Sequence, residues 1–155
     1  MPVIEKIGQV DIERIRLEIE AIPPGAQVCL QGIEGQTDPF WGNESADDFY
    51  ESNLEEEFIH PLFELPYLNF IMKNYRLSRT RLMRQSKKTC YSLHIDDTKR
   101  YHIPVYTNDN CFFVIDDKIY RLPSDGSIYL VDTTLMHTAV NASFEERTHI
   151  VGNAL

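Results

Sequence analysis

The sequence predicts a mainly β protein, a jelly-roll or small barrel that N-terminal helices support. From Arg79 onward, the chain has eight short runs that are rich in aromatic and β-branched residues and that alternate in polarity. Turn-forming residues separate these runs, and eight short strands spread evenly over about 75 residues are typical of jelly rolls and closed barrels. The runs cover residues 79–85, 89–95, 100–107, 110–116, 118–123, 127–133, 137–143 and 147–153.

The first half of the chain contains the helix signals. Asp11 is a suitable N-cap for a helix over residues 12–22, in which isoleucines recur at steps of three and four. The Pro-Pro-Gly sequence that follows ends this helix. A second helix is predicted to begin at Pro66, because proline fits the first helical turn, and to continue to Tyr75.

A strand is predicted over residues 26–32, and residues 33–53 after it contain turn formers with no hydrophobic period. Loops of this length usually serve as lids or are disordered, and the aromatic Trp41 favours a lid that reaches the functional pocket. At 155 residues, the chain fits one domain. We expect residues 1–78 to form an α/β support that carries the lid, and residues 79–152 to form the β core.

The composition excludes several classes of protein. With 43% hydrophobic and 25% charged residues, the chain is an ordinary globular sequence, and no uncharged run is long enough to span a membrane. Lys and Arg number 15 against 24 Asp and Glu, for a net charge of −9, which argues against nucleic-acid binding because phosphate binding depends on Lys and Arg.

The charges are unevenly distributed along the chain. Residues 17–72 hold twelve carboxylates and no Lys or Arg, whereas residues 73–100 hold nine Lys and Arg and only Asp96 and Asp97. This polarity indicates either two solvated faces or a cationic groove that faces an anionic small molecule.

The three cysteines indicate a reducing environment. Cys29, Cys90 and Cys111 are far apart and odd in number, and each lies in an apolar run, which predicts buried free thiols rather than a disulfide or a zinc site. The N-terminus lacks the continuous apolar stretch of a signal peptide. We therefore expect a cytoplasmic protein with no membrane partner.

The strongest local signal is the His94-Ile95-Asp96 sequence in the second predicted strand. In a strand, residues i and i+2 point to the same face, so an imidazole and a carboxylate lie side by side. His137, at the start of the seventh predicted strand, is available as a third ligand. Two histidines and one carboxylate on one face of a β-barrel form the facial triad of non-haem Fe(II) oxygenases, which leaves positions open for a cosubstrate and dioxygen.

The eighth predicted strand contains a cation that can bind a carboxylate group of a small dicarboxylate. Arg147 lies ten residues after His137, and its guanidinium fork suits a carboxylate. His149, two residues later on the same face, is predicted to be structural because the triad is already complete. Asp132, five residues before His137, either accepts hydrogen bonds within a turn or orients His137.

These motifs together resemble the aspartyl/asparaginyl β-hydroxylase-like branch of the 2-oxoglutarate- and Fe(II)-dependent dioxygenases. The resemblance covers residues 79–152. Several motifs agree at once: HxD, then TKRYHIP, then G-x(10)-H with an Asp five residues before its His, then N-x-S and an Arg ten residues after that His. The resemblance implies a double-stranded β-helix, the jelly-roll or cupin-like barrel, for this part of the chain.

The resemblance also implies roles for individual residues. It makes His94, Asp96 and His137 the ligands of Fe(II), with 2-oxoglutarate and dioxygen as cosubstrates, and it assigns the distal carboxylate of 2-oxoglutarate to Arg147. Other positions that match the pocket of the family, or lie on strands facing it, are Arg100, His102, Arg81, Met83 and Tyr91. Arg100 is expected to reach either the second carboxylate of 2-oxoglutarate or a carboxylate of the substrate.

One position departs from part of the family. Members that hydroxylate epidermal-growth-factor-like domains have Gly where this chain has Asp96. The departure completes the His-Asp-His triad, which favours iron binding and argues against the same peptide substrate.

Three functions remain in competition at this point. The first is a 2-oxoglutarate- and Fe(II)-dependent hydroxylase that acts on a free amino acid or small carboxylate, or else on a protein or peptide residue whose basic surroundings dock on the acidic segment 34–64, with succinate and CO2 released. The second is a non-catalytic cupin-like module that binds a metal or a small acid. The third is a zinc or manganese cupin enzyme, in which Arg147 has no cosubstrate to hold.

Overall fold

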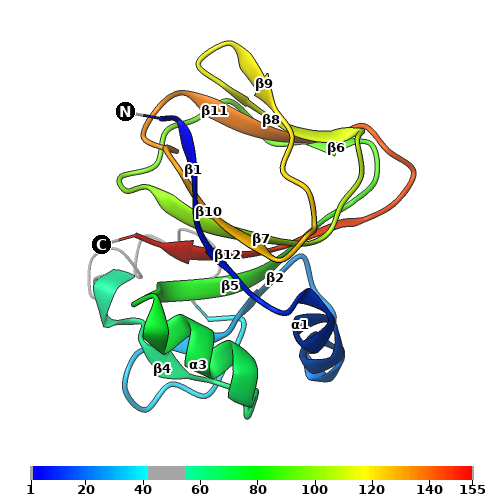
Figure 1. Ribbon diagram of the computed structural model, residues 1–155. Helices are drawn as coiled ribbons and strands as arrows, with labels where there is room; N and C mark the ends of the chain where they lie inside the picture. The colour runs from blue at the N-terminus through cyan, green and yellow to red at the C-terminus, as the bar shows by residue number, and fades with distance from the viewer. Residues whose placement is uncertain (1, 42–54, 155) are drawn as a thin grey trace.

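The structure is a computed structural model that describes residues 2–41 and 55–154, and two antiparallel sheets dominate it (Figure 1). The larger sheet has six strands in the order β1-β10-β7-β12-β5-β2, and the smaller sheet has four in the order β6-β11-β8-β9. The larger sheet consists of β1 (Ile4–Gln9), β2 (Gln27–Cys29), β5 (Ser78–Gln85), β7 (Arg100–Tyr106), β10 (Ser127–Val131) and β12 (Arg147–Asn153). The smaller sheet consists of β6 (Thr89–Cys90), β8 (Cys111–Ile115), β9 (Lys118–Tyr120) and β11 (His137–Asn141). The prediction of a mainly β protein is confirmed.

Each of the eight predicted runs contains a strand, but the strand in the second run is much shorter than expected. β6 covers only Thr89–Cys90, and after it the chain leaves the regular ladder until His94 forms an isolated antiparallel bridge with His137. The sequence analysis did not predict β1, which pairs with β10 from residue 4 to residue 9. Its pairing partner lies about 120 residues away along the chain, so local sequence offers little signal for it.

The helices follow the predicted signals. Asp11 caps α1 (Ile12–Glu18), and its Oδ1 accepts hydrogen bonds from the backbone N–H groups of Glu13 and Arg14 at 3.1 and 3.3 Å. A 3-10 turn, η1 (Ile19–Ala21), continues α1 up to the Pro-Pro sequence. α3 (Pro66–Asn74) has Pro66 in its first turn, as expected. Among the described residues, no helix combines the length and apolar character that a bilayer span requires.

Short elements complete the N-terminal half. β3 (Gln31–Gly32) and β4 (His60–Pro61) form a two-stranded sheet, and η2 (Glu55–Glu57) precedes β4. Most of the predicted lid, residues 42–53, lies outside the described residues. Trp41, the last described residue before that stretch, stacks on Phe58 with ring centroids 5.8 Å apart.

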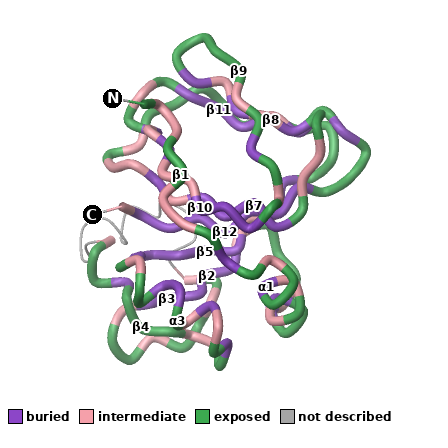
Figure 2. Tube along the Cα trace, in the orientation of Figure 1, coloured by how far each residue is buried: buried purple, intermediate pink, exposed green. Residues whose placement is uncertain are grey.

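Alternation along the strands of the larger sheet gives its two faces different chemistry. One face packs on α1 and α3 (Figure 1), and the strands of this sheet are largely buried (Figure 2). The apolar side chains of this face make the main core with those of the helices. From the sheet, this core contains Val28, Leu82, Ile103, Val105, Ile128 and Ile150. The opposite face carries buried polar residues, among them Arg81, Arg100, His102, Arg147 and His149. A six-stranded sheet with one apolar and one cationic face therefore positions the functional side chains.

The smaller sheet lies across from this polar face (Figure 1). Its inward side chains Phe113, Ile115 and Ala139 join Leu122 and Val131 in a second, smaller core. Polar residues of the larger sheet therefore face a partly apolar wall.

The cysteines are free, as the sequence indicates, but only two of them are buried. Cys29 and Cys111 lie in the interior, whereas Cys90 is exposed. The prediction for Cys90 was wrong because the short β6 lies at the edge of its sheet, where the apolar run around this residue has no covering layer.

Candidate metal centre

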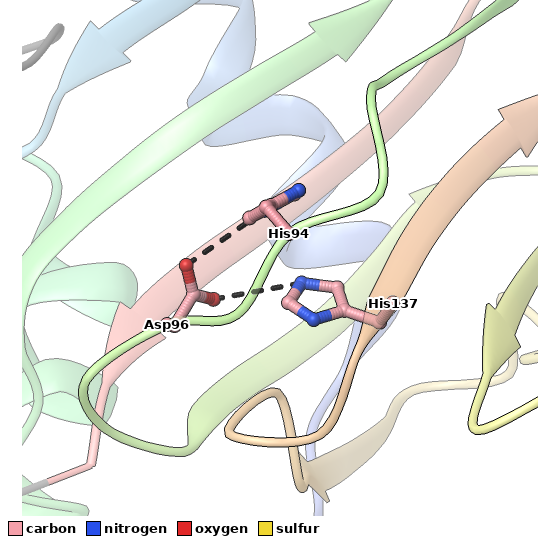
Figure 3. Close-up of side chains that lie close together, drawn as sticks. All are labelled: His94, Asp96 and His137. Atoms are coloured by element: carbon pink, nitrogen blue, oxygen red, sulfur yellow. Dashed lines mark ion pairs between the residues drawn. The ribbon is translucent and has the colours of Figure 1, made fainter.

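The side chains of His94, Asp96 and His137 converge between the two sheets. Nε2 of His94 lies 3.8 Å from Oδ1 of Asp96, and Nε2 of His137 lies 3.6 Å from Oδ2. Figure 3 shows both imidazole rings turned towards the carboxylate. One ligand atom from each residue lies within 4.8 Å of the others. Ligands held about 2.1 Å from one metal ion are about 3–4 Å apart, so a small movement of these side chains brings them onto one ion.

Backbone hydrogen bonds hold the three residues in register. His94 and His137 exchange both of their backbone hydrogen bonds, at 3.0 and 2.9 Å, and the backbone N–H of Asp96 donates to the carbonyl of Thr133 at 2.9 Å. The HxD sequence was expected on a regular strand, which is wrong, because only His94 pairs there. The extended backbone around this bridge is nevertheless enough to place His94 and Asp96 on the same side.

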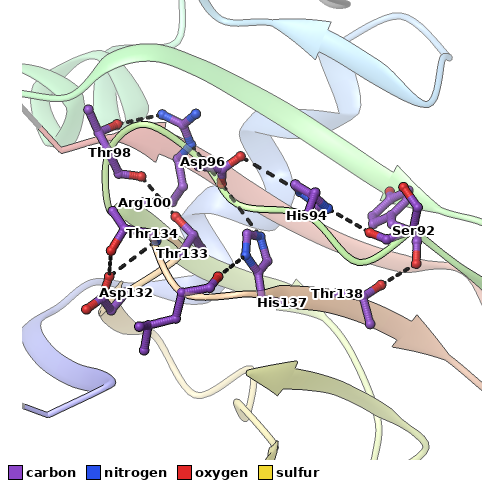
Figure 4. Close-up of polar contacts among 12 residues, drawn as sticks. Ser92, His94, Asp96, Thr98, Arg100, Asp132, Thr133, Thr134, His137 and Thr138 are labelled. Atoms are coloured by element: carbon purple, nitrogen blue, oxygen red, sulfur yellow. Dashed lines mark hydrogen bonds and ion pairs between the residues drawn. The ribbon is translucent and has the colours of Figure 1, made fainter. Parts of the chain in front are cut away.

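The hydrogen bonds of the imidazoles fix which nitrogen faces the carboxylate. Nδ1 of His94 lies 2.7 Å from the carbonyl of Ser92, and Nδ1 of His137 lies 2.9 Å from the carbonyl of Leu135 (Figure 4). A carbonyl only accepts hydrogen bonds, so each Nδ1 carries a proton, and each Nε2 is the ring nitrogen left to bind a metal. Two imidazole Nε2 atoms and a carboxylate are therefore preorganised for a divalent cation.

Asp132 belongs to a turn and does not orient His137. Its Oδ1 accepts hydrogen bonds from the backbone N–H and the hydroxyl of Thr134 (Figure 4). Of the two roles that the sequence left open, the structure supports the turn.

A cavity of about 390 Å³ contains this triad and nearly all of the predicted pocket residues. Nine of them line it: His94, Asp96, His137, Arg100, His102, Arg147, Arg81, Met83 and Tyr91. Trp41 is not among the lining residues, because its ring stacks on Phe58 instead. Lining residues that the sequence analysis missed are Gln27, Ser92, Phe113, Thr133, Ala139 and Val151. Ser92 lies two residues before His94, so the same alternation that relates His94 to Asp96 could have identified it.

Arg147 is a buried cation that lacks a carboxylate partner among the described residues. Its exposed fraction is 3%, and its guanidinium carbon lies 5.6 Å from the centroid of the Phe113 ring. Its Nε finds no hydrogen-bond acceptor in the described part of the chain. Burial lowers the pKa of the guanidinium. Because a buried unpaired cation is costly, Arg147 is poised for an anionic ligand that enters the cavity.

Two further arginines make the cavity strongly cationic. Nη1 of Arg81 donates to Oε1 of Gln27 at 3.1 Å, and Nε of Arg100 lies 3.4 Å from Oδ2 of Asp96. Burial, together with the neighbouring cations Arg79 and Arg100, lowers the pKa of Arg81 to about 10, so it stays protonated at neutral pH. Positive charge focused in a recess attracts small anions.

Glu55 connects three strands behind the cavity, and the sequence analysis gave it no role. One carboxylate oxygen pairs with Nη1 of Arg79 at 2.5 Å, and the other lies 3.4 Å from Nη1 of Arg100 and accepts from Nδ2 of Asn153 at 2.5 Å. It stands in a run of acidic residues, and nothing in the sequence distinguishes it from its neighbours Glu56 and Glu57.

Replacing Glu55 with Ala is expected to lower the free energy of unfolding by about 3 kcal/mol, because the mostly buried guanidinium groups of Arg79 and Arg100 then each lose one ion pair. Urea denaturation measures the change. The exposed neighbour Glu56 provides the control, since Glu56→Ala should alter stability by less than about 0.5 kcal/mol. Equal effects of the two substitutions would contradict a structural role for the Glu55 ion pairs.

Two buried histidines lie beside Arg147 on neighbouring strands. Nδ1 of His102 lies 3.1 Å from Nδ1 of His149, and the two rings are nearly perpendicular at 77°. Burial, then the charge of Arg147, lowers the pKa values of both histidines well below 6.5. Both rings are therefore neutral at physiological pH.

Lowering the pH from 7 to 5.5 is expected to destabilise the protein through these two rings. Below about pH 6.5, the unfolded chain protonates both histidines while the folded chain keeps them neutral, so stability falls as the pH falls. The expected loss is about 1.4 kcal/mol per pH unit for each ring. Urea denaturation at the two pH values measures it, with His149→Leu as the comparison, which should show a smaller loss. The same loss in the variant would show that other groups carry the acid sensitivity.

Comparison with known proteins identifies a family for the chain. The sequence matches the family described as aspartyl/asparaginyl beta-hydroxylase over residues 61–153, more than half of the chain. A solved structure described as the crystal structure of IDO from Bacillus thuringiensis is similar over 92% of this chain and 81% of its own, with a TM-score of 0.47 and 11% identity. Among curated protein sequences, none matches the chain significantly. The family match spans the HxD segment, the strand of His137 and the strand of Arg147, so the chain belongs to the aspartyl/asparaginyl β-hydroxylase family.

Proposed function

We propose that this protein is a 2-oxoglutarate- and Fe(II)-dependent dioxygenase that hydroxylates an unactivated C–H bond of a small, amino-acid-like substrate. One observation carries the proposal. The Nε2 atoms of His94 and His137 and the Asp96 carboxylate converge in the same cavity in which Arg147 is buried without a carboxylate partner among the described residues. A metal site beside a buried cation that has no carboxylate partner among the described residues suits a metal that works together with an anionic cosubstrate.

The donor set fits Fe(II). His94, Asp96 and His137 would hold the ion through two nitrogens and one oxygen, the ligands typical of non-haem iron oxygenases with open positions. Arg147 would hold the distal carboxylate of 2-oxoglutarate through its guanidinium fork. When bound, the iron together with 2-oxoglutarate and dioxygen supplies the oxidation of a C–H bond to an alcohol, with succinate and CO2 as coproducts.

The chain itself contributes positioning, electrostatics and the exclusion of water. The carbonyls of Ser92 and Leu135 hold the Nδ1 protons and keep both Nε2 lone pairs aimed at the ion. The apolar side chains of Phe113, Ala139 and Val151 cover part of the cavity wall, which limits water around the reacting centre. Arg81 and Arg100 add positive charge that favours a carboxylate on the substrate.

We propose that β5 to β12 form a double-stranded β-helix. Successive strands alternate between the larger and the smaller sheet, with β8 and β9 paired as a hairpin in the smaller one. This alternation between two facing sheets is the arrangement of a jelly roll. The strands β1 and β2 extend the two edges of the larger sheet, in keeping with a support formed by residues 1–78. The three free thiols suit a cytoplasmic location.

Succinate release tests the proposal. Purified protein is incubated with Fe(II), 2-oxoglutarate, ascorbate and air, alone and with each free amino acid, and succinate is quantified. We expect slow release alone and faster release with an acidic or amide amino acid. Faster succinate release with a peptide only would indicate that the substrate is a residue of a protein or peptide. Tight metal binding without succinate under any condition would overturn the proposal in favour of a non-catalytic cupin-like binding module.

A further inference from the structure

His149 lies outside the main cavity but touches a residue that lines it. His102 lines the cavity together with Arg147, whereas His149 lines a separate small void with Cys111 and Phe112. Both rings also make edge contacts with Phe113, at centroid distances of 5.0 and 6.0 Å. The Nδ1–Nδ1 contact of 3.1 Å therefore runs from the interior of the fold to the wall of the cavity.

A contact between two Nδ1 atoms requires complementary tautomers. Two protonated nitrogens would repel one another, and two bare nitrogens could not form a hydrogen bond, so one Nδ1 carries a proton and the other accepts it. Both rings are neutral, hence each has only one ring proton. The ring that accepts at Nδ1 must therefore carry its proton on Nε2.

The charge of the cavity selects between the two arrangements. If His149 donates, His102 carries its proton on Nε2 and gives the cavity wall a hydrogen-bond donor. If His102 donates, its Nε2 is an acceptor. Because Arg81, Arg100 and Arg147 line the same cavity and attract an anion, a donor on His102 is complementary to the bound molecule and an acceptor is not.

We propose that His149 is a positioning residue that donates its Nδ1 proton to Nδ1 of His102 and thereby holds His102 as the Nε2–H tautomer, a donor to an anionic group in the cavity. For the identity of that anion, this inference rests on the proposed function, with 2-oxoglutarate as the probe. His149 itself touches neither the probe nor the metal ligands; it acts through His102. The arrangement supplies a neutral donor where protonated histidine would be costly to bury.

Nitrogen NMR tests the tautomers directly. Protein with ¹⁵N-labelled histidine is loaded with diamagnetic Zn(II), and long-range ¹H–¹⁵N correlation spectra are recorded at neutral pH with assignment by single substitution. We expect a protonated Nε2 on His102 and a protonated Nδ1 on His149. The reverse pattern, or two rings with the same tautomer, would overturn the inference whatever the protein catalyses.

Two substitutions at His149 separate positioning from packing. His149→Leu removes the donor but fills space, whereas His149→Asn keeps an amide N–H near the place of Nδ1. In the leucine variant, we expect the KM for 2-oxoglutarate to rise about tenfold, the effect of one hydrogen bond to an anion, with Fe(II) affinity unchanged. The asparagine variant should recover most of this loss.

The possible failures are distinguishable. If the wild-type protein binds 2-oxoglutarate and both variants bind it equally well, the inference fails and the proposed function stands. If the wild-type protein does not bind 2-oxoglutarate at all, the proposed function fails, and the NMR spectra still decide whether His149 sets the tautomer of His102.

Discussion

Replacing Asp96 with Ala is expected to weaken Fe(II) binding by at least about 100-fold. Residues that only hydrogen-bond to a metal ligand already contribute about 10- to 100-fold to metal affinity, and a ligand itself should contribute at least as much. Asp96 is the one anionic residue of the triad, and Arg100 lies 3.4 Å from its carboxylate. Without the carboxylate, a divalent cation would meet two neutral imidazoles in a cavity that three arginines line. Isothermal titration under argon measures the affinity.

Asp97 provides a matched control for this substitution. It is the next residue along the chain, it is exposed, and it has the same side chain. Asp97→Ala should bind Fe(II) as the wild-type protein does. Comparable losses in the two variants would mean that general negative charge, rather than coordination by Asp96, accounts for the affinity.

Replacing Arg147 with Met is expected to raise the KM for 2-oxoglutarate about 100-fold, since a bidentate charge-assisted contact to a carboxylate is among the strongest single interactions in a binding site. The same substitution should not destabilise the protein without ligand. Arg147 is buried, burial lowers its pKa, and its Nε lacks an acceptor in the described residues. Replacement of such a group by an apolar side chain of similar length is often neutral or stabilising.

Steady-state kinetics and thermal denaturation together decide this prediction. Arg147→Lys keeps the charge but loses the fork, so its KM should lie between those of the wild-type protein and the methionine variant. A methionine variant that unfolds far below the wild-type protein and binds 2-oxoglutarate normally would show that Arg147 supports the fold and does not hold the cosubstrate.

The sequence predicted the β core well, because its signals are local. The runs from residue 79 to residue 153 alternate in polarity, turn formers separate most of them, and each contains a strand in the structure. The helix that follows Asp11 and the helix that begins at Pro66 were equally predictable from an N-cap and from a proline in the first turn.

The errors have a different physical origin, since they concern contacts between distant segments. β1 forms only because β10 offers it an edge, and Gln27 reaches the cavity only because β2 pairs with β5. Glu55 gains its role from partners on β5, β7 and β12. The pocket assignment for Trp41 relied on its position in a loop, and the structure places its ring on Phe58.

The candidate site was largely predictable because one part of its spacing is local and the other follows from the arrangement of the strands. His94 and Asp96 are two residues apart, which an extended backbone turns into one face. His137 and Arg147 lie on β11 and β12, which face each other across the cavity. The role of His149 was not predictable, because its partner His102 lies on another strand and the contact depends on the register between β7 and β12.

One measurement tests the central claim, that the triad and Arg147 form one site for Fe(II) and 2-oxoglutarate. Metal-free protein is titrated anaerobically with Fe(II) and then with 2-oxoglutarate, while visible absorption is recorded. We predict a metal-to-ligand charge-transfer band that appears only after the second addition, is absent in Asp96→Ala and is weakened in Arg147→Met. Saturating Fe(II) binding with no band on addition of 2-oxoglutarate would contradict the account.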